Sequence, residues 1–247
     1  MMAQRRKSGF KQVALTLKRL TCGPFLCTLA GAFWVVLMFC SGAAGASAQT
    51  SKKAPEPAQA APVAAQVKAE WRGGLISPPL PKPKFTLTDT SGAPFDFWSK
   101  TQGSVTLLFF GYTHCPDVCP LQMHMIAQAM KALPTNAASQ IKVAFVTTDP
   151  ARDTTQVLRA YLDRYDKRFI GLTGSEDAIV AAQIAAKLEP AKKGTVRPDG
   201  NYEVGHAAFA LAYSKDNLAH IIYPLGLKPE DWEHDLPQLA AENWARQ

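Results

Sequence analysis

Two cysteines, Cys115 and Cys119, are the residues of this chain whose type and spacing most clearly predict chemistry. They are four positions apart and lie between an apolar run over residues 105–110 and a helical pattern that begins near Leu121. The N-terminus of a helix carries partial positive charge, which stabilises a thiolate relative to a thiol. The spacing therefore predicts either a redox-active dithiol or a site for a soft metal ion.

The other three cysteines lie in the first 48 residues, which carry the features of an export signal. A basic N-terminus precedes an apolar segment from Phe25 to Phe39, and the small residues Ala46 to Ala48 fit a cleavage site. The uncharged span from Thr21 to Ser51 is also long enough for an uncleaved membrane anchor. Whether the leader is cleaved or kept as an anchor, the basic N-terminus predicts a domain in the periplasm or on the periplasmic face of the inner membrane. A mitochondrial inner-membrane setting is the alternative.

The exported part of the chain is nearly neutral. The chain has 27 basic and 20 acidic residues, but six of the basic ones occur in the first 20 positions and no acidic residue precedes Glu56, so the net charge beyond residue 48 is +1. This balance gives no support to a nucleic-acid partner. Without the leader only Cys115 and Cys119 remain, and a disulfide that closes so short a loop removes little chain entropy. We therefore interpret the pair as functional rather than structural.

The chain divides into an export signal or uncleaved anchor over residues 1–48, a linker rich in alanine and proline over residues 49–84, and a domain over residues 85–247. Hydrophobic periodicity within the domain predicts an N-terminal strand pair, then alternating strands and helices, a hairpin insertion and a last helix. The expected strands are residues 85–88, 95–97, 105–110, 141–147, 169–172, 207–213 and 219–223, and the expected helices are residues 121–133, 154–165, 176–188 and 229–245. This order predicts an α/β, thioredoxin-like fold whose mixed central sheet has helices on both faces.

The cysteine block resembles the signature of the SCO/SenC family of copper proteins. Four blocks carry the resemblance in family order across nearly the whole domain: residues 111–120, 148–154, 168–174 and 204–206. The resemblance implies a thioredoxin-like protein that binds Cu(I), Cu(II) or both through Cys115, Cys119 and His206. It also implies a role in assembling the copper centre of cytochrome c oxidase, with the copper-bearing subunit of the oxidase, and another copper chaperone, as partners.

The ligand types agree with that implication. Thiolates are soft ligands that suit Cu(I), and imidazole suits both oxidation states of copper. Two thiolates and one imidazole lack the fourth strong ligand of a closed structural metal site, and such openness fits a protein that passes its metal on.

His206 directly precedes a predicted strand, at the position where thioredoxin-like oxidoreductases usually carry a cis-proline. No proline occurs between Pro198 and Pro224, which favours copper binding over simple dithiol exchange. Many relatives place an acidic residue before this histidine and a hydroxyl residue after it, whereas this chain has Gly205 and Ala207. A group that orients the imidazole is therefore either missing or supplied from elsewhere.

Two further functions use the same cysteines. A thiol–disulfide oxidoreductase that reduces the cysteines of the oxidase copper site would need Cys115 and Cys119 but not His206. A peroxiredoxin-like peroxidase or redox sensor would need one cysteine of low pKa and an activating arginine, for which Arg152 is the candidate. A metallochaperone, which is not an enzyme, is the interpretation we favour.

Other polar and sulfur-containing side chains near the motifs have structural explanations. Met123 follows Cys119 by one helical turn, but a methionine on such a helix fills the core more often than it binds metal. Asp153 or Thr154 is expected to cap the next helix. Tyr112 is expected to pack under the cysteine loop, and Asp117 to be a solvated acid. His114 and His124 flank the site and are expected to lie at the surface or to tune local charge, whereas His220 and His234 lie far from it in the sequence and are assigned no role.

Overall fold

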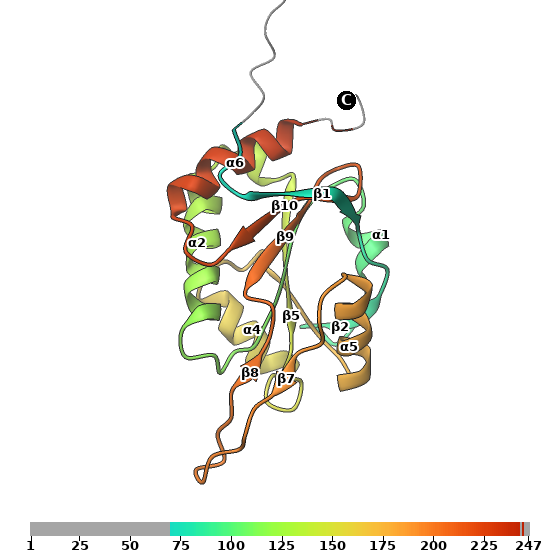
Figure 1. Ribbon diagram of the computed structural model, residues 1–247, viewed down its shortest axis with the longest axis vertical. Coiled ribbons are helices and arrows are strands. Elements are labelled where there is room, and N and C mark those ends of the chain that lie inside the picture. The colour runs from blue at the N-terminus through green and yellow to red at the C-terminus, as the bar shows by residue number, and fades with distance from the viewer. Residues whose placement is uncertain (1–69, 243, 245–247) are drawn as a thin grey trace, which may run out of the picture. The chain divides into compact units, whose positions relative to one another are not determined.

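The computed structural model describes residues 70–242 and residue 244, so the predicted leader and most of the predicted linker lie outside the described residues. An eight-stranded mixed sheet, in the order β1-β10-β9-β4-β5-β6-β2-β3, forms the centre of this part of the chain (Figure 1). Its strands are β1 (Gly74–Pro81), β2 (Thr86–Asp89), β3 (Pro94–Asp96), β4 (Val105–Gly111), β5 (Ile141–Thr147), β6 (Ile170–Thr173), β9 (Phe209–Tyr213) and β10 (Leu218–Pro224). The helices are α1 (Phe97–Thr101), α2 (Val118–Ala132), α3 (Thr135–Ala138), α4 (Thr155–Asp163), α5 (Glu176–Ala185) and α6 (Pro229–Ala241).

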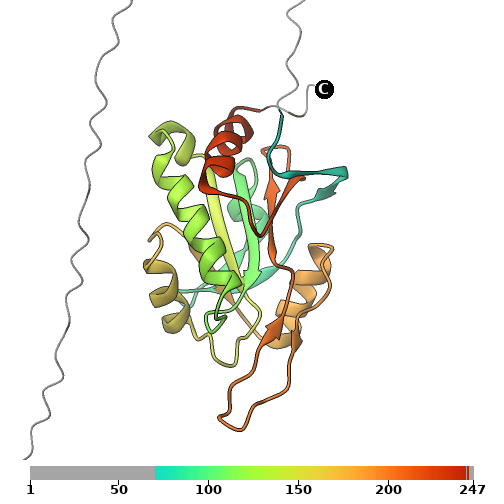
Figure 2. The same cartoon turned by 60° about the vertical axis from the view of Figure 1, so that its left-hand side comes forward.

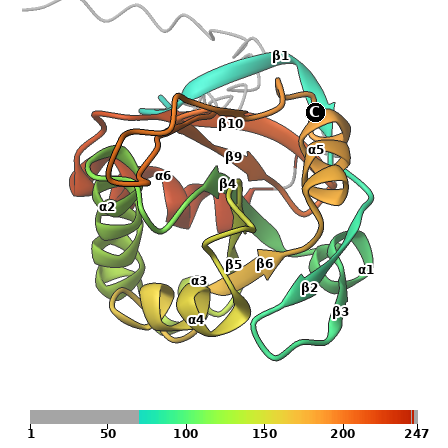
Figure 3. The same ribbon diagram turned by 90° about the horizontal axis from the view of Figure 1, so that it is seen from below.

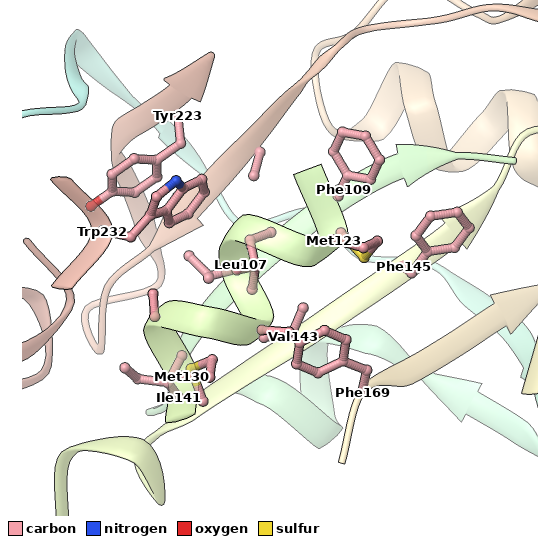
Figure 4. Packing of buried hydrophobic residues seen from close by; sticks show 14 of the residues in the cluster. Leu107, Phe109, Met123, Met130, Ile141, Val143, Phe145, Phe169, Tyr223 and Trp232 are labelled. Atoms are coloured by element: carbon pink, nitrogen blue, oxygen red, sulfur yellow. The ribbon is translucent and has the colours of Figure 1, made fainter. Parts of the chain in front are cut away.

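Helices cover both faces of the sheet, as the sequence predicts. All seven residues of β4 are buried, because this strand lies in the middle of the sheet between β5 and β9. One face packs against α2, α4 and α6, and the other packs against α1 and α5 (Figure 3). On the first face, Leu107 and Phe109 of β4 contact a cluster that includes Trp232 of α6 (Figure 4). The thioredoxin-like α/β prediction is therefore confirmed.

The predicted hairpin is present, but its strands belong to the central sheet. β9 and β10 pair antiparallel, and β9 also pairs antiparallel with β4. The predicted N-terminal strand pair is β2 and β3, at the opposite edge of the sheet from β1. A second, two-stranded sheet of β7 (Lys192–Lys193) and β8 (Val204–Gly205) was not expected from the sequence.

The folded domain begins earlier than predicted. Residues Gly74–Pro81, within the segment interpreted as a linker over 49–84, form β1 and pair antiparallel with β10. The strand contains three prolines, which are tolerated because β1 lies at the edge of the sheet and prolines cannot donate a ladder hydrogen bond. The fully buried Asp235 of α6 accepts backbone hydrogen bonds from Arg72 and Gly73 and so holds the start of this segment against the domain.

Among the described residues, each helix is too short or too polar to cross a lipid bilayer. The predicted leader, with its alternatives of cleavage and anchoring, lies in residues 1–48, outside the described part of the chain.

Candidate metal centre

Three segments that are far apart in the sequence meet at one end of the central strands. β4 pairs parallel with β5, with Gly111 opposite Thr147, so the residues that follow both strands emerge at the same edge. β9 runs antiparallel to β4, with Phe109 opposite Ala210, so the residues that precede β9 emerge there as well. This topology brings the cysteine loop after β4, the acidic block after β5 and the segment of His206 together.

The two cysteines lie at the start of α2. Cys115 is partly exposed in the loop, whereas Cys119 is fully buried in the first turn of the helix. The backbone N–H of Cys119 donates to Cys115 Sγ at 3.4 Å, so the helix N-terminus offers a donor to the first thiol. The end of β4 approaches the second thiol closely, because a Cβ atom at Gly111 would lie 2.9 Å from Cys119 Sγ.

His206 lies beside the buried thiol. Its Nε2 is 3.3 Å from Cys119 Sγ, and its ring makes edge-to-face contacts with Phe109 and Tyr112 at centroid distances of 5.9 and 5.8 Å. The Nδ1 atom is 3.0 Å from the backbone oxygen of Ala207. Because a carbonyl oxygen only accepts hydrogen bonds, Nδ1 is the donor in this contact, and Nε2 is the ring nitrogen that faces the thiols. The group that orients the imidazole, which the sequence did not identify, is therefore the backbone carbonyl of Ala207.

The structure thus brings together all three residues that the resemblance implied as copper ligands. One ligand atom from each of Cys115, Cys119 and His206 lies within 4.8 Å of the other two. Two sulfurs and one imidazole nitrogen form a donor set that suits copper, particularly Cu(I).

The two thiols have opposite protonation tendencies. The hydrogen bond with the Cys119 thiol, with help from the backbone N–H groups of Cys119 and Asp117 and from His206, lowers the pKa of Cys115 to about 5. That hydrogen bond to Cys115, together with burial, raises the pKa of Cys119 well above its ordinary value. Near neutral pH the pair therefore consists of an accessible thiolate and a buried thiol.

This asymmetry predicts selective alkylation of the reduced, metal-free protein. We expect iodoacetamide to modify Cys115, at a rate that is nearly constant from about pH 6.5 to about pH 8 and falls as the pH drops through about 5. An ordinary cysteine with a pKa of about 8.5 would react roughly twentyfold faster at the upper than at the lower end of that interval. Mass spectrometry of samples quenched at each pH measures both sites. Faster modification of Cys119, or a rate for Cys115 that rises across the interval, would contradict the assignment.

Met123 and the other histidines have structural contacts of their own. Met123 is fully buried among Phe109 and Phe145, which confirms its interpretation as a core residue (Figure 4). The remaining histidines contact other groups: His114 contacts Thr113 and Asp153, His124 contacts Gln128, His220 contacts Asp216, and His234 contacts Asp235. Tyr112 is buried beside the cysteine loop, as predicted, and Asp117 is exposed.

Asp153 has a role that sequence reasoning missed. Thr154 is the residue that caps α4, with its hydroxyl accepting from the N–H of Val157. Asp153 is fully buried and accepts hydrogen bonds from the backbone and hydroxyl of Thr113, at 2.9 and 2.6 Å, and from the hydroxyl of Thr147 at 2.6 Å. It therefore joins the cysteine loop to the end of β5. The block over residues 148–154 was visible in the sequence, but its long-range partners were not.

The fold and these side chains define a class: thioredoxin-like domains that present a thiol pair and a histidine at one end of the sheet. Within that class the chain belongs to the SCO1/SenC family, whose family model matches residues 76–241.

Individual relatives agree with this membership. A SCO2-like protein of Rickettsia prowazekii is 35% identical over 132 residues, which are 53% of this chain and 63% of that protein. The mitochondrial protein SCO2 of Saccharomyces cerevisiae is 34% identical over 125 residues, which are 51% of this chain and 41% of that protein. In both cases the match spans less than two thirds of the relative. The structure of Bradyrhizobium japonicum ScoI with copper bound superposes with a TM-score of 0.58 at 32% identity and covers 65% of this chain and 99% of that one.

Proposed function

We propose that this protein binds copper through Cys115, Cys119 and His206 and delivers it for assembly of the binuclear copper centre of cytochrome c oxidase. The observation that carries the proposal is the position of His206, whose Nε2 faces the thiols and lies 3.3 Å from Cys119 Sγ. Dithiol exchange requires only the two thiols, whereas an imidazole at this position completes the proposed copper site. The copper-bound structure of the Bradyrhizobium japonicum relative supports the choice of metal.

A metallochaperone must both bind copper and release it, and the ligands of this site allow both steps. Cys115 offers a thiolate directly, whereas Cys119 must release its proton when copper binds. With three protein ligands the metal keeps an open position, through which a ligand from a recipient protein can enter before the first ligands leave. The partial exposure of Cys115 and His206 leaves one side of the site accessible to that recipient.

The partners and the location belong to the same proposal. The recipient is the copper-bearing subunit of the oxidase, and another copper chaperone is a suitable donor. The basic leader would export the domain to the periplasm or hold it on the periplasmic face of the inner membrane.

Thiol–disulfide exchange is the second candidate function, and the unequal thiols favour it. A thiolate beside a buried thiol is the arrangement that attacks a substrate disulfide and then resolves the mixed disulfide. Under this alternative the protein would reduce the cysteines of the oxidase copper site before they receive metal. The peroxidase alternative is less favoured, because the guanidinium of Arg152, its candidate activating arginine, is paired with Asp149.

Copper titration of the reduced protein tests the proposal. We expect one equivalent of Cu(I) to be withheld from a chromophoric chelator, and this copper to move to the copper-free soluble domain of the oxidase subunit after mixing. Metal analysis of the two proteins after size-exclusion chromatography measures the transfer. Weak copper binding, together with ready cycling of a Cys115–Cys119 disulfide, would favour the oxidoreductase instead.

A further inference from the structure

The segment that carries His206 has few anchors. Of residues 192–205, only Tyr202 and Val204 are buried, and the others are exposed. Figures 1 and 2 show this segment, with β7 and β8, extending away from the central sheet. His206 follows directly and precedes β9, so on its N-terminal side the position of its imidazole depends on how Tyr202 and Val204 are held.

Tyr202 is held by a cluster of polar contacts with the block after β5. Its hydroxyl donates to Asp149 Oδ1 at 2.7 Å, and its backbone oxygen accepts from Arg152 at 3.1 Å. The guanidinium of Arg152 also stacks on the Tyr202 ring at 3.6 Å from the ring centroid and forms an ion pair with Asp149. Each of the three residues therefore contacts the other two.

The contacts within this cluster are strengthened by burial. Asp149 is buried and Arg152 has a side-chain exposure of 18%, so their ion pair is largely shielded from water. Charge-assisted hydrogen bonds and a cation stacked on an aromatic ring are both stronger in such surroundings than on an open surface. Burial and the bond to Asp149 raise the pKa of Tyr202, so its hydroxyl stays protonated and continues to donate.

The same cluster also reaches the cysteine side of the centre. The guanidinium of Arg152 lies 5.8 Å from the ring centroid of Tyr112, and Tyr112 makes an edge contact with His206. Asp153, four positions after Asp149, holds Thr113. The block after β5 therefore contacts both ligand-bearing segments, although it supplies no ligand of its own.

We propose that Asp149, Arg152 and Tyr202 are positioning residues that hold His206 at the cysteine pair. This inference rests on the proposed function, because it concerns the contribution that His206 makes to copper binding. Without the cluster, the exposed segment would leave the imidazole free to move away from the thiols, and copper would keep only its two sulfur ligands.

The test compares variants in two backgrounds, the natural chain and His206→Ala. In the natural background we expect Tyr202→Phe to weaken Cu(I) binding about tenfold and Arg152→Ala about a hundredfold, the range found when groups that orient metal ligands are lost. In the His206→Ala background both changes should have almost no effect. Arg197→Ala is the matched control, because Arg197 lies in the same segment and its ion pair with Glu203 is exposed.

A second readout follows the metal-free protein. Hydrogen exchange of the backbone from residue 202 to residue 206 should be faster in Tyr202→Phe and Arg152→Ala and unchanged in Arg197→Ala. Thermal unfolding of each variant identifies a loss of the whole fold, and Tyr202→Phe, which removes a single oxygen atom, tests the inference if Arg152→Ala does not fold.

Two outcomes overturn the inference while leaving the proposed function intact. One is an equal loss of copper affinity in both backgrounds, which would reveal a general structural role. The other is unchanged copper affinity in Tyr202→Phe and Arg152→Ala when His206→Ala itself weakens binding. If His206→Ala alone leaves the copper affinity unchanged, the proposed ligand set is wrong, and the inference is overturned with it.

Discussion

Replacing either cysteine with serine is expected to abolish tight copper binding and disulfide formation together. Cys115 and Cys119 supply both soft donors of the centre, and a serine oxygen is a hard donor with little affinity for Cu(I). The loss should exceed about a hundredfold, which is the upper limit for loss of a group that merely orients a ligand. Competition with a chromophoric Cu(I) chelator measures the affinity, and a thiol count before and after oxidation measures the disulfide.

Met123→Leu is the matched control for the cysteine variants. Met123 lies one turn after Cys119 and is also fully buried, so the substitution replaces the sulfur-containing side chain of the next helical turn with one of similar volume. We expect its copper affinity to equal that of the natural chain. A serine variant that keeps tight copper, or a leucine variant that loses it, would show that the metal is bound by a different set of atoms.

The sequence predicted the parts of the fold that local patterns encode. β5 matches its predicted range, and α5 begins at Glu176 as predicted, after a cap by the Ser175 side chain, because buried strands and helix caps depend on neighbouring residues. β1 was missed for the opposite reason. Its prolines are typical of a linker, and only its pairing with β10, more than 130 residues later in the chain, identifies it as a strand.

The same contrast between local and long-range information applies to the residues of the candidate centre. The cysteine motif and His206 could be found through the resemblance, because they stand in recognisable blocks. The group that orients His206 could not be found, since it is the backbone oxygen of Ala207 and every residue has such an oxygen. The cluster of Asp149, Arg152 and Tyr202 joins residues some 50 positions apart, which no local spacing predicts.

Replacing His206 with alanine is expected to separate copper binding from thiol chemistry. The variant loses the only nitrogen ligand of the proposed centre, so its affinity for copper should fall by at least about a hundredfold. Both thiols remain at the start of α2, with the N–H of Cys119 still directed at Cys115 Sγ. The disulfide should therefore still form reversibly, with its potential within about 30 mV of that of the natural chain, which corresponds to a tenfold change in equilibrium constant.

The comparison needs copper affinity and disulfide potential from the same preparation. His124→Ala is the control, because His124 is an exposed imidazole on α2 that contacts Gln128, and its removal should change neither quantity. A metallochaperone requires the two quantities to separate in His206→Ala, since the imidazole serves the metal and not the thiols. Loss of the disulfide with copper affinity unchanged would instead assign His206 to thiol exchange, where an imidazole near a buried thiol can accept its proton.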